Sequence, residues 1–330
     1  MSWDITGHSW AVHLLQQHIA RGEVRHAYLF TGQQGVGRRS LALQFARALN
    51  CTNPPTSGGS CGECRACKGI AQSSHPDLAI IQRLEDKTRI LIDQIRSLQH
   101  TLILAPYESR YRIALLVNFH EATDEAQNAL LKTLEEAPEK VILLLTAESP
   151  ESLLPTIVSR CELMRLRPMP LEELEEVLKK EQKVGNEEAR LYSHLAQGCP
   201  GKAINILENP ALLTQRRSWL DDALRLLSAS RHERFRFAER ESKNRNDLKQ
   251  ILQTWMSLWR DLMIVSEGAP LPLINLDYQS QLEALSVQVP AAIAQKCIAG
   301  LDLSLDRIEK NANPRLLLEV LLLDWPFIKT

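Results

Sequence analysis

The stretch HAYLFTGQQGVGRRS, His26–Ser40, decides the fold of the first part of the chain. An apolar run in this stretch leads into three glycines: Gly32, Gly35 and Gly37. They are spaced as in the phosphate-binding loop pattern G-x-x-x-x-G-K-[ST], in which the lysine holds nucleotide phosphates and the hydroxyl holds Mg²⁺. Here those two positions are Arg38 and Arg39. The stretch therefore predicts a strand, a glycine turn and a helix, without the two groups that handle the nucleotide.

Short apolar runs alternate with helical patterns through the first half of the chain. The runs are nearly continuous in apolar residues, which is typical of strands covered on both faces. They are His26–Phe30, Leu78–Gln82, Arg112–Val117, Val141–Thr146 and Cys161–Leu166. Between them, Leu41, Phe45 and Leu49 recur at every fourth position and predict an amphipathic helix, and Glu125–Glu136 has the same pattern. The first half is therefore expected to be an α/β unit with a parallel sheet.

The pattern changes after Pro168 and Pro170, which mark an expected boundary. Helical periodicity dominates from there, first in a compact segment that closes around a turn at Gly198–Gly201. Longer amphipathic helices follow from about Pro210. The basic stretch Arg231–Arg245 is expected to be a solvated helix face with a loop.

The bulk composition is that of an ordinary soluble globular protein. The chain has 330 residues, of which 44% are hydrophobic and 24% charged, and its formal net charge is -1. This balance gives no overall basic field for tight nucleic-acid binding by the chain alone. No signal sequence and no apolar run of about 20 residues is visible, so a cytoplasmic location without membrane contact is expected. Seven cysteines in such a chain indicate metal binding or buried thiols rather than disulfides.

Four of the cysteines form the pattern C-x₉-C-x₂-C-x₂-C: Cys51, Cys61, Cys64 and Cys67. Such spacing lets short turns present four thiolates to one tetrahedral ion, and the interpretation it favours is one structural Zn²⁺ per chain. An iron–sulfur cluster and unliganded thiols stay open as alternatives. A closed site with four cysteines stabilises a fold and does not catalyse. Cys161, Cys199 and Cys297 are isolated in the sequence and are expected to be buried packing thiols.

Several motifs in fixed order resemble one known family. The glycine loop, the cysteine insertion, NALLKTLEEAPE and IVSRC together resemble the clamp-loader branch of AAA+ proteins. The resemblance runs from about Trp3 to Leu207 and continues more weakly through the C-terminal helices, including Trp255–Asp261 and Asn311–Glu319.

The resemblance implies a three-part architecture. An α/β P-loop NTPase domain of the AAA+ type, with a parallel sheet and the zinc insertion, is expected over residues 1–167, with the zinc module at 51–67. A small helical lid domain is expected at 168–208. An all-α C-terminal collar domain for oligomerisation is expected at 209–330.

Several nucleotide-handling groups of active family members are missing. The strand before NALLK ends there in an Asp-Glu pair that holds Mg²⁺ and polarises the attacking water. Counting back from Asn128, those positions are Val117 and Asn118. Thr146 falls near the family's sensor-1 position, and Gly201 stands where a lid arginine senses the γ-phosphate. The resemblance therefore implies that this chain neither binds nor hydrolyses ATP with Mg²⁺.

Two features of the altered loop leave alternatives open. Glu121 is a nearby carboxylate, but it lies outside the motif of the missing acidic pair. Arg38 at the lysine position can still contact a phosphate or another anion. The interpretation that the sequence favours is that Arg38 and Arg39 cap the loop or pair with carboxylates.

The motif Ser159-Arg160-Cys161 is intact. In relatives its arginine reaches across a subunit interface to the ATP of the neighbour, as an arginine finger. The planar guanidinium suits the charge that develops on a transferred phosphoryl group. The alternative is that Arg160 pairs with a local carboxylate such as Glu162.

The predicted function is that of a non-catalytic clamp-loader subunit. Such a subunit helps to load the sliding clamp onto primer–template DNA, with gamma/tau-type ATPase subunits and a delta-type subunit as partners in the ring. The alternative is a self-sufficient AAA+ ATPase with a non-standard active site that uses Arg38. A zinc-dependent DNA-binding module rests on the cysteines alone, because the cysteine segment lacks interleaved basic and aromatic residues.

Overall fold

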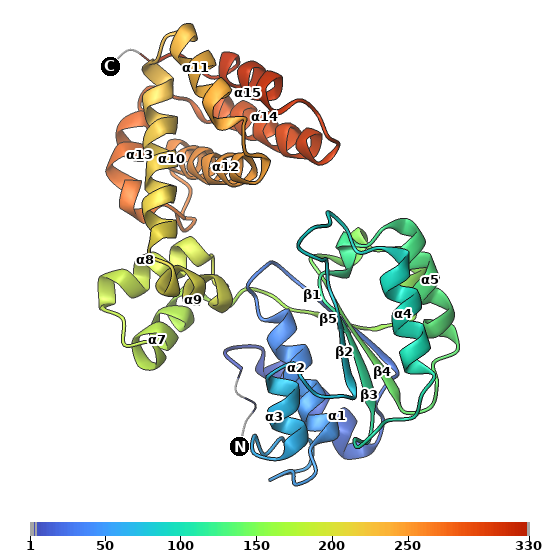
Figure 1. The fold of residues 1–330 in the computed structure, drawn as a ribbon. Helices are drawn as coiled ribbons and strands as arrows, with labels where there is room; N and C mark the ends of the chain where they lie inside the picture. Colours follow the sequence, from blue (N-terminus) through green and yellow to red (C-terminus); the bar gives the residue numbers. More distant parts are fainter. Residues whose placement is uncertain (1–2, 4, 329–330) are drawn as a thin grey trace. The chain divides into compact units, whose positions relative to one another are not determined.

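The protein was analysed as a computed structural model that describes residues 3 and 5–328. It divides into two compact units, which we describe separately (Figure 1). The first comprises Met1–Val177 with Gly198–Lys202, and the second comprises Leu178–Gln197 with Ala203–Thr330. The three-domain partition expected from the sequence stays a prediction. Among the described residues, no helix is both long and apolar enough to cross a membrane.

The first unit is built on a five-stranded parallel sheet. Its strands are β1 Ala27–Thr31, β2 Leu78–Ile81, β3 Arg112–Leu116, β4 Val141–Ala147 and β5 Glu162–Arg165. The strand order is β2-β3-β4-β1-β5, and each neighbouring pair is parallel. All five predicted strands are confirmed, and each predicted boundary lies within one residue of the observed one. The carboxyl ends of the strands therefore share one edge, where the segments that follow them meet.

Helices cover both faces of this sheet, as the continuous apolar runs predict (Figure 1). One face carries α1 Ser9–Arg21, α2 Arg38–Asn50 and α3 Arg65–Ala71, and the other carries α4 Ile92–Leu102 and α5 Asp124–Glu135. Along β1 the side chains alternate between two cores: Tyr28 and Phe30 pack in the core with Phe45 of α2, and Leu29 packs in the core with Leu98 and Leu130. Short elements follow the strand ends: η1 Phe119–Glu121, η2 Pro150–Ser152 and α6 Pro155–Val158.

Three helices follow the predicted boundary at the two prolines: α7 Leu171–Glu181, α8 Asn186–Ala196 and α9 Pro200–Glu208. The turn expected at Gly198–Gly201 is shorter than the sequence indicates. Gln197 and Gly198 have left-handed backbones and end α8, and α9 then begins at Pro200, so Gly201 is already helical. Proline suits this place because its fixed φ matches the first helical position and its missing N–H is not needed there.

The C-terminal part of the second unit is all helical. Its elements are α10 Ala211–Ser228, α11 Arg231–Glu241, α12 Arg245–Glu267, η3 Leu276–Tyr278, α13 Gln279–Ser286, α14 Ala291–Glu309 and α15 Pro314–Leu323. The central helix α12 buries Trp255 and Trp259, and the ring of Trp325 lies 4.8 Å and 5.3 Å from their ring centroids. This aromatic cluster gives the unit its own hydrophobic core.

One residue of the basic stretch Arg231–Arg245 departs from the expected solvated face. Arg234 is 5% exposed, and its guanidinium donates hydrogen bonds to backbone carbonyls only. The acceptors are Leu226, Leu227, Leu322, Trp325 and Pro326. Arg234 therefore ties α11 to the C-terminal segment, because five donors in a fixed plane can satisfy several carbonyls at once.

Candidate functional site

The glycine loop joins β1 to α2 and keeps its frame for backbone reasons. Gly32 and Gly35 have φ values of 148° and 80°, which residues with a side chain rarely adopt. A Cβ on Gly32 would lie 2.4 Å from the carbonyl oxygen of Leu166, and one on Gly35 would lie 2.6 Å from Cγ of Lys202. The loop glycines are thus required by the fold, whether or not the loop holds a ligand.

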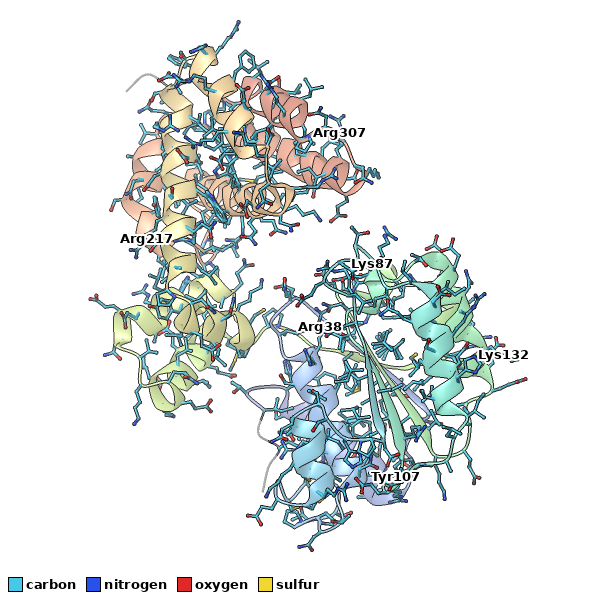
Figure 2. The ribbon with its side chains drawn as sticks, in the orientation of Figure 1. Arg38, Lys87, Tyr107, Lys132, Arg217 and Arg307 are labelled. Atoms are coloured by element: carbon cyan, nitrogen blue, oxygen red, sulfur yellow. The ribbon has the colours of Figure 1, made fainter. Side chains whose placement is uncertain are left out.

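Arg38, at the position of the phosphate-binding lysine, turns toward the carboxyl end of the sheet (Figure 2). It is 7% exposed, and its Nη2 donates a hydrogen bond of 3.2 Å to Oδ1 of Asn118. Its Nη1 is buried and has no hydrogen-bond partner among the described residues. Burial lowers the pKa of Arg38, and the nearby Glu148 carboxylate partly counters this. Arg39, the next residue, is exposed.

The edge where active relatives hold Mg²⁺ lacks a metal-binding pair. Val117 offers no ligand atom, and Asn118 adopts a left-handed backbone with φ of 50°. The backbone N–H of Asn118 donates to Oγ1 of Thr146 at 2.7 Å, so Thr146 fixes this strand end. Glu121, the nearby carboxylate, accepts a hydrogen bond from Nε of Arg83 at 2.9 Å. These contacts with Thr146 and Arg83 fix the side chains and backbone at this strand end.

The first turn of α9 contacts the glycine loop directly. The backbone N–H of Gly201 donates to the carbonyl of Gly35 at 2.8 Å, and a Cβ on Gly201 would lie 2.9 Å from that oxygen. Next to it, Sγ of Cys199 lies 3.7 Å from Oε1 of Gln33. Relatives carry the sensor arginine at position 201. In this chain the close backbone contact leaves too little room for a Cβ, so glycine fits there.

Arg160 lies between α6 and β5, with its side chain 36% exposed. Its Nη2 donates to Oε1 of Glu135 at 2.7 Å, and its Nη1 donates to the carbonyl of Thr156 at 3.0 Å. Arg160 therefore pairs with a carboxylate, as the alternative interpretation expects, but the partner is Glu135 of α5 rather than Glu162. Exposed ion pairs contribute about 0–1 kcal/mol, so another partner can replace this one at little cost.

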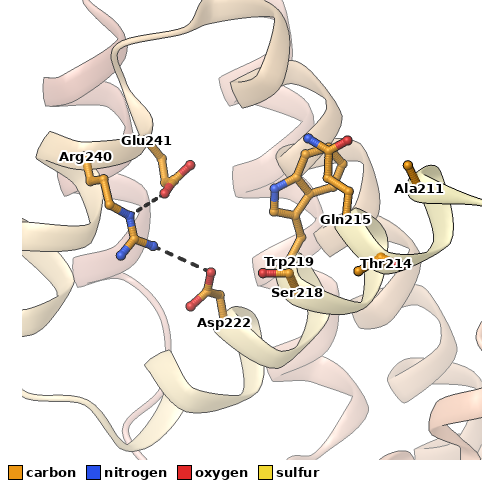
Figure 3. A pocket seen from close by; sticks show the side chains of 8 residues that line it. All are labelled: Ala211, Thr214, Gln215, Ser218, Trp219, Asp222, Arg240 and Glu241. Atoms are coloured by element: carbon orange, nitrogen blue, oxygen red, sulfur yellow. Dashed lines mark hydrogen bonds and ion pairs between the residues drawn. The ribbon is translucent and has the colours of Figure 1, made fainter.

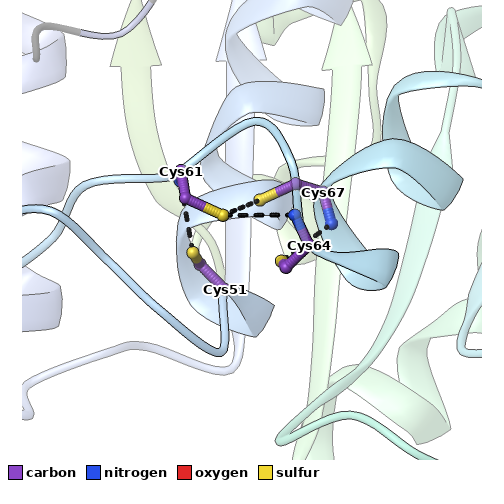
Figure 4. Close-up of side chains that lie close together, drawn as sticks. All are labelled: Cys51, Cys61, Cys64 and Cys67. Atoms are coloured by element: carbon purple, nitrogen blue, oxygen red, sulfur yellow. Dashed lines mark hydrogen bonds between the residues drawn. The ribbon is translucent and has the colours of Figure 1, made fainter.

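The four cysteines of the insertion converge as their spacing predicts (Figure 4). Their sulfur atoms all lie within 4.8 Å of one another, and Sγ of Cys61 is 3.9 Å from Sγ of Cys67. Zinc–thiolate bonds of about 2.3 Å in a tetrahedron place sulfur atoms about 3.8 Å apart. The donor set and its dimensions therefore fit a tetrahedral ion that prefers thiolates.

Backbone N–H groups point at the cysteine sulfurs and favour their charged form. They belong to Cys61, Cys64 and Cys67, at 3.3, 3.3 and 3.4 Å from the sulfurs of Cys51, Cys61 and Cys64. Burial acts to raise the pKa of Cys64, but the N–H groups of Thr52 and Cys67 lower it to about 6. Burial raises the pKa of Cys67 to about 12. A bound cation would compensate this burial by stabilising the thiolate.

The cysteine insertion is docked on α1. Nε1 of Trp3 donates to the carbonyl of Gly58 at 3.0 Å, and a Cβ on Gly58 would lie 2.7 Å from the carbonyl oxygen of Gln16. Of the isolated cysteines, Cys199 and Cys297 are buried as predicted. The remaining one, Cys161, is only partly buried.

The second unit carries a polar groove of about 670 Å³ on α10 and α11 (Figure 3). Trp219 lines it, and Arg240 lies at one side in ion pairs with Asp222 and Glu241. Of the segments singled out in the sequence, the basic stretch Arg231–Arg245 reaches this groove, through Arg240 and Glu241.

Two partners in these contacts were not expected from the sequence. Glu135 is the second-last residue of the segment NALLKTLEE, and Asn118 was identified only as a lost carboxylate. No local pattern links Glu135 to Arg160 or Asn118 to Arg38, because the paired residues lie 25 and 80 positions apart. Only the order of the strands brings each pair together.

Comparison with known proteins agrees with this geometry. The profile of the family described as "DNA polymerase III, delta subunit" matches residues 7–170, and that described as "DNA polymerase III, delta subunit, C terminal" matches residues 211–326. The DNA polymerase III subunit delta' of Bacillus subtilis is 28% identical over 317 residues, which cover 94% of this chain and 93% of that protein. The chain belongs to the delta-prime-like clamp-loader subunits of DNA polymerase III.

Other relatives of this delta-prime-like chain match over shorter parts of their own length. The delta' subunit of Pseudomonas aeruginosa is 38% identical over 152 residues, 46% of each protein. The tau subunit of Bacillus subtilis is 26% identical over 96% of this chain, but the chain spans only 60% of tau. A gamma subunit-related protein of DNA polymerase III from Thermotoga maritima, whose crystal structure is known, has the same fold with a TM-score of 0.52 at 19% identity, over 94% of this chain and 97% of that one.

Proposed function

We propose that this delta-prime-like chain is a non-catalytic subunit of the clamp loader, which helps to load the sliding clamp onto primed DNA and supplies Arg160 to the ATP site of a neighbouring subunit. The observation that carries the proposal is a contrast within one unit. The metal-binding edge has Val117 and Asn118 in place of the acidic pair, whereas Arg160 is intact and partly exposed.

The absence of catalysis follows from the chemistry of the loop edge. Phosphoryl transfer needs a metal ion to neutralise the developing charge and a base or polarising group for the water. Valine has no ligand atom, and the side-chain oxygen of Asn118 already accepts a hydrogen bond from Arg38. Glu121 lies outside the motif of the missing acidic pair and forms an ion pair with Arg83, so we do not assign it the role of that pair.

The role of Arg160 follows from its charge and its weak local contact. A guanidinium stays charged at all relevant pH values and presents paired donors to phosphate oxygens. Its ion pair with Glu135 is solvent-exposed, with side-chain exposures of 36% and 51%. When a neighbouring subunit presents a nucleotide, exchange of Glu135 for the phosphate costs little. Arginine fingers elsewhere accelerate hydrolysis about 10³–10⁵-fold.

Assembly into a ring is supported by an apolar stripe on α15. Leu316, Val320 and Leu323 recur on one face of this helix, and the exposed Phe327 follows its C-terminal end. Their exposures are 59%, 53%, 44% and 61%. Such a stripe is typical of a helix that packs against a partner. We propose that it contacts a gamma/tau-type or delta-type subunit in the collar.

The cysteine cluster is proposed to hold one structural Zn²⁺ through Cys51, Cys61, Cys64 and Cys67. The metal would supply a tetrahedral cross-link between the end of α2 and the start of α3. The insertion docks on α1, and no carboxylate or histidine takes part in the cluster of described ligand residues. Its role is therefore proposed to be structural rather than catalytic.

The experiment is reconstitution of the clamp loader with Arg160→Ala in this subunit. The variant is expected to assemble normally, while DNA- and clamp-stimulated ATP turnover falls, because one site in the ring loses its finger. Phosphate release by the assembled complex measures the effect, with size-exclusion chromatography as the check on assembly. Unchanged turnover in fully assembled rings would show that Arg160 has no role in catalysis.

Glu135→Gln is the matched control. It removes the carboxylate that holds Arg160 but leaves the guanidinium in place. Turnover is expected to stay at or above the unmodified level. Equal losses in Glu135→Gln and Arg160→Ala would mean that the ion pair, and not a contact with a neighbour's nucleotide, is what the ring requires.

A further inference from the structure

We propose that the metal-bound state of the cysteine cluster controls the order of the segment 107–111, which joins α4 to β3, and that Asn50 and His75 connect the cluster to this segment. The inference rests on the structural metal proposed above. It extends the effect of that metal from the insertion to a segment that contains none of the cysteines.

The cysteine insertion is flanked by two buried polar residues. Asn50 is 3% exposed and is the last residue of α2, directly before Cys51. His75 is 4% exposed and comes shortly after α3, whose N-cap is Cys64 and which contains Cys67. Each side of the cluster therefore continues into a polar side chain that needs a partner within the protein, because burial removes it from water.

Asn50 has its partner in the backbone of Tyr111, the last residue before β3. Its Nδ2 donates to the carbonyl of Tyr111 at 2.9 Å, and its Oδ1 accepts the N–H of Tyr111 at 2.9 Å. One side chain thus satisfies both backbone groups of one residue. This pair of bonds fixes the end of the segment 107–111 relative to the end of α2.

His75 connects α3 to the other half of the segment. A Cβ on Gly69 of α3 would lie 3.1 Å from Cδ2 of His75, so the ring packs directly on this helix. Nδ1 of the ring accepts the N–H of Asp77 at 3.1 Å, so Nε2 carries the ring proton. Nε2 lies 3.3 Å from Oε1 of Glu108 and 3.4 Å from Oγ of Ser109. The imidazole is therefore held between α3 and the segment.

Helix α3 has little stability of its own. It has seven residues, and isolated helices shorter than about 12–15 residues are marginal in water. Its N-cap is the sulfur of Cys64, which accepts the N–H of Cys67 at 3.4 Å. A metal bound by the cluster would hold this helix start against the end of α2. Without the metal, Asn50 and His75 belong to elements whose separation is no longer fixed, so the segment that both contact loosens.

A third contact limits how far the segment can loosen. Asp77 accepts the N–H groups of Tyr107, Glu108 and Ser109, and it lies directly before β2 rather than in the insertion. The ion pair of Arg65 with Glu108 adds little, because the Arg65 side chain is 80% exposed. We therefore expect faster local opening of the segment and not its complete unfolding.

The experiment is hydrogen exchange, read by mass spectrometry, on the full chain with its metal and after a chelator has removed the metal under reducing conditions. Zinc content is measured on the same samples. Removal is expected to speed exchange in residues 107–111 at least about tenfold, because the free energy of local opening falls, while β4 keeps its rate. Added Zn²⁺ is expected to restore the protection.

The outcomes separate this inference from the metal proposal. A purified chain that contains no zinc overturns both. A chain that loses its zinc without any change in residues 107–111 overturns this inference alone. Equal acceleration in β4 also overturns it, since general destabilisation would then explain the result.

Asn50→Ala tests the connection in the metal-loaded chain. It is expected to keep its zinc and to speed exchange at Tyr111 at least about tenfold, because the segment loses both bonds of the amide. Asn53→Ala is the matched control, since it makes the same change at an exposed side chain of the insertion, and its effect is expected to be less than about twofold.

Unchanged exchange in zinc-loaded Asn50→Ala, or equal acceleration in both variants, overturns the assignment to Asn50. If Asn50→Ala does not fold, the comparison of the metal-loaded and metal-free unmodified chain still decides whether the cluster controls the segment.

Discussion

The two ends of helix α2 differ in which functional side chains they carry. At its start, the glycine loop keeps its backbone frame but carries Arg38 and Arg39 where a lysine and a hydroxyl are needed. At its end, Cys51 begins a cluster in which four sulfurs lie within 4.8 Å of one another. One end has kept the frame without the reactive groups, and the other has a complete donor set.

This difference shows that backbone frame and side-chain chemistry vary independently. Glycines in the loop persist because a Cβ on Gly32 would meet a carbonyl at 2.4 Å, which is a requirement of packing. Cysteines in the cluster have no such packing reason, because three of the four are only partly buried. The proposed metal ion would explain why four thiols lie together, whereas the loop glycines are explained by the fold alone.

The largest effect is expected from Cys67→Ala, which removes one of the four thiols of the cysteine cluster. Zinc is expected to fall from about one per chain to less than about 0.2, because removal of one thiolate weakens a site worth about 10–16 kcal/mol in small zinc peptides. Residues 51–71 should lose hydrogen-exchange protection while the sheet keeps it. Metal analysis of chain purified without chelators measures the first effect. Cys297→Ala, which removes a cysteine outside the cluster, should leave the zinc content unchanged.

The next-largest effect is expected at Asp77. This buried carboxylate has hydrogen-bond partners for both oxygens, whereas Nη1 of Arg38 has none among the described residues. Asp77 accepts N–H bonds from Tyr107, Glu108 and Ser109 at 2.6, 3.0 and 2.9 Å. In Figure 2, Tyr107 lies at the opposite end of the sheet from Arg38. Asp77→Asn is expected to lower the free energy of unfolding by about 3 kcal/mol at pH 7, since backbone donors would lose a charged acceptor.

The pH dependence gives the sign of this prediction. Burial acts to raise the pKa of Asp77, but the N–H donors hold it below its ordinary value of 3.8. Because the pKa of Asp77 is lower in the folded than in the unfolded protein, its ionised carboxylate stabilises the fold at pH values above the ordinary pKa. This stabilisation is lost as the pH falls through the pKa of the folded state. Denaturant melts of the two proteins should therefore converge below about pH 4. Asp93→Asn, at a side chain that is 85% exposed, should change stability little at any pH.

A smaller effect is expected where α9 contacts the glycine loop. Gly201→Ala places a Cβ 2.9 Å from the carbonyl oxygen of Gly35. Thermal unfolding should show a loss of about 1–2 kcal/mol, because overpacking exceeds the gain in helix propensity. Gly300→Ala is the control, since its Cβ would meet only a leucine methyl at 3.4 Å. A neutral Gly201→Ala would mean that the contact does not constrain the loop.

The smallest effect is expected from restoring the loop alone. The double variant Arg38→Lys, Arg39→Thr recreates the phosphate-binding pattern, yet it leaves Val117 and Asn118 at the metal edge. Steady-state phosphate release by the purified chain is expected to stay at background, because Val117 and Asn118 do not supply the acidic pair that holds Mg²⁺ and polarises water. Turnover above background that depends on Mg²⁺ would mean that the loop was the only missing part.

The strands and the cysteine cluster could be predicted from the sequence because their signals are local. Each of the five apolar runs became a strand within one residue of its predicted bounds, since a fully buried parallel strand needs an unbroken run of apolar side chains. The C-x₂-C steps likewise place neighbouring thiolates together through short turns. The start of α9 was placed less well, because Pro200 and Gly201 fit a turn and a first helical turn alike.

The sequence by itself determined the α/β fold of the first unit, the four-cysteine cluster and the loss of the acidic pair, because each of these depends on residue types at short spacings. Only the tertiary structure decided which partners Arg38 and Arg160 have. Asn118 and Glu135 lie 80 and 25 positions away from them. The parallel strand order brings the two members of each pair to the same edge of the sheet. Burial then leaves Nη1 of Arg38 without a hydrogen-bond partner among the described residues, whereas Arg160 keeps a solvent-exposed ion pair.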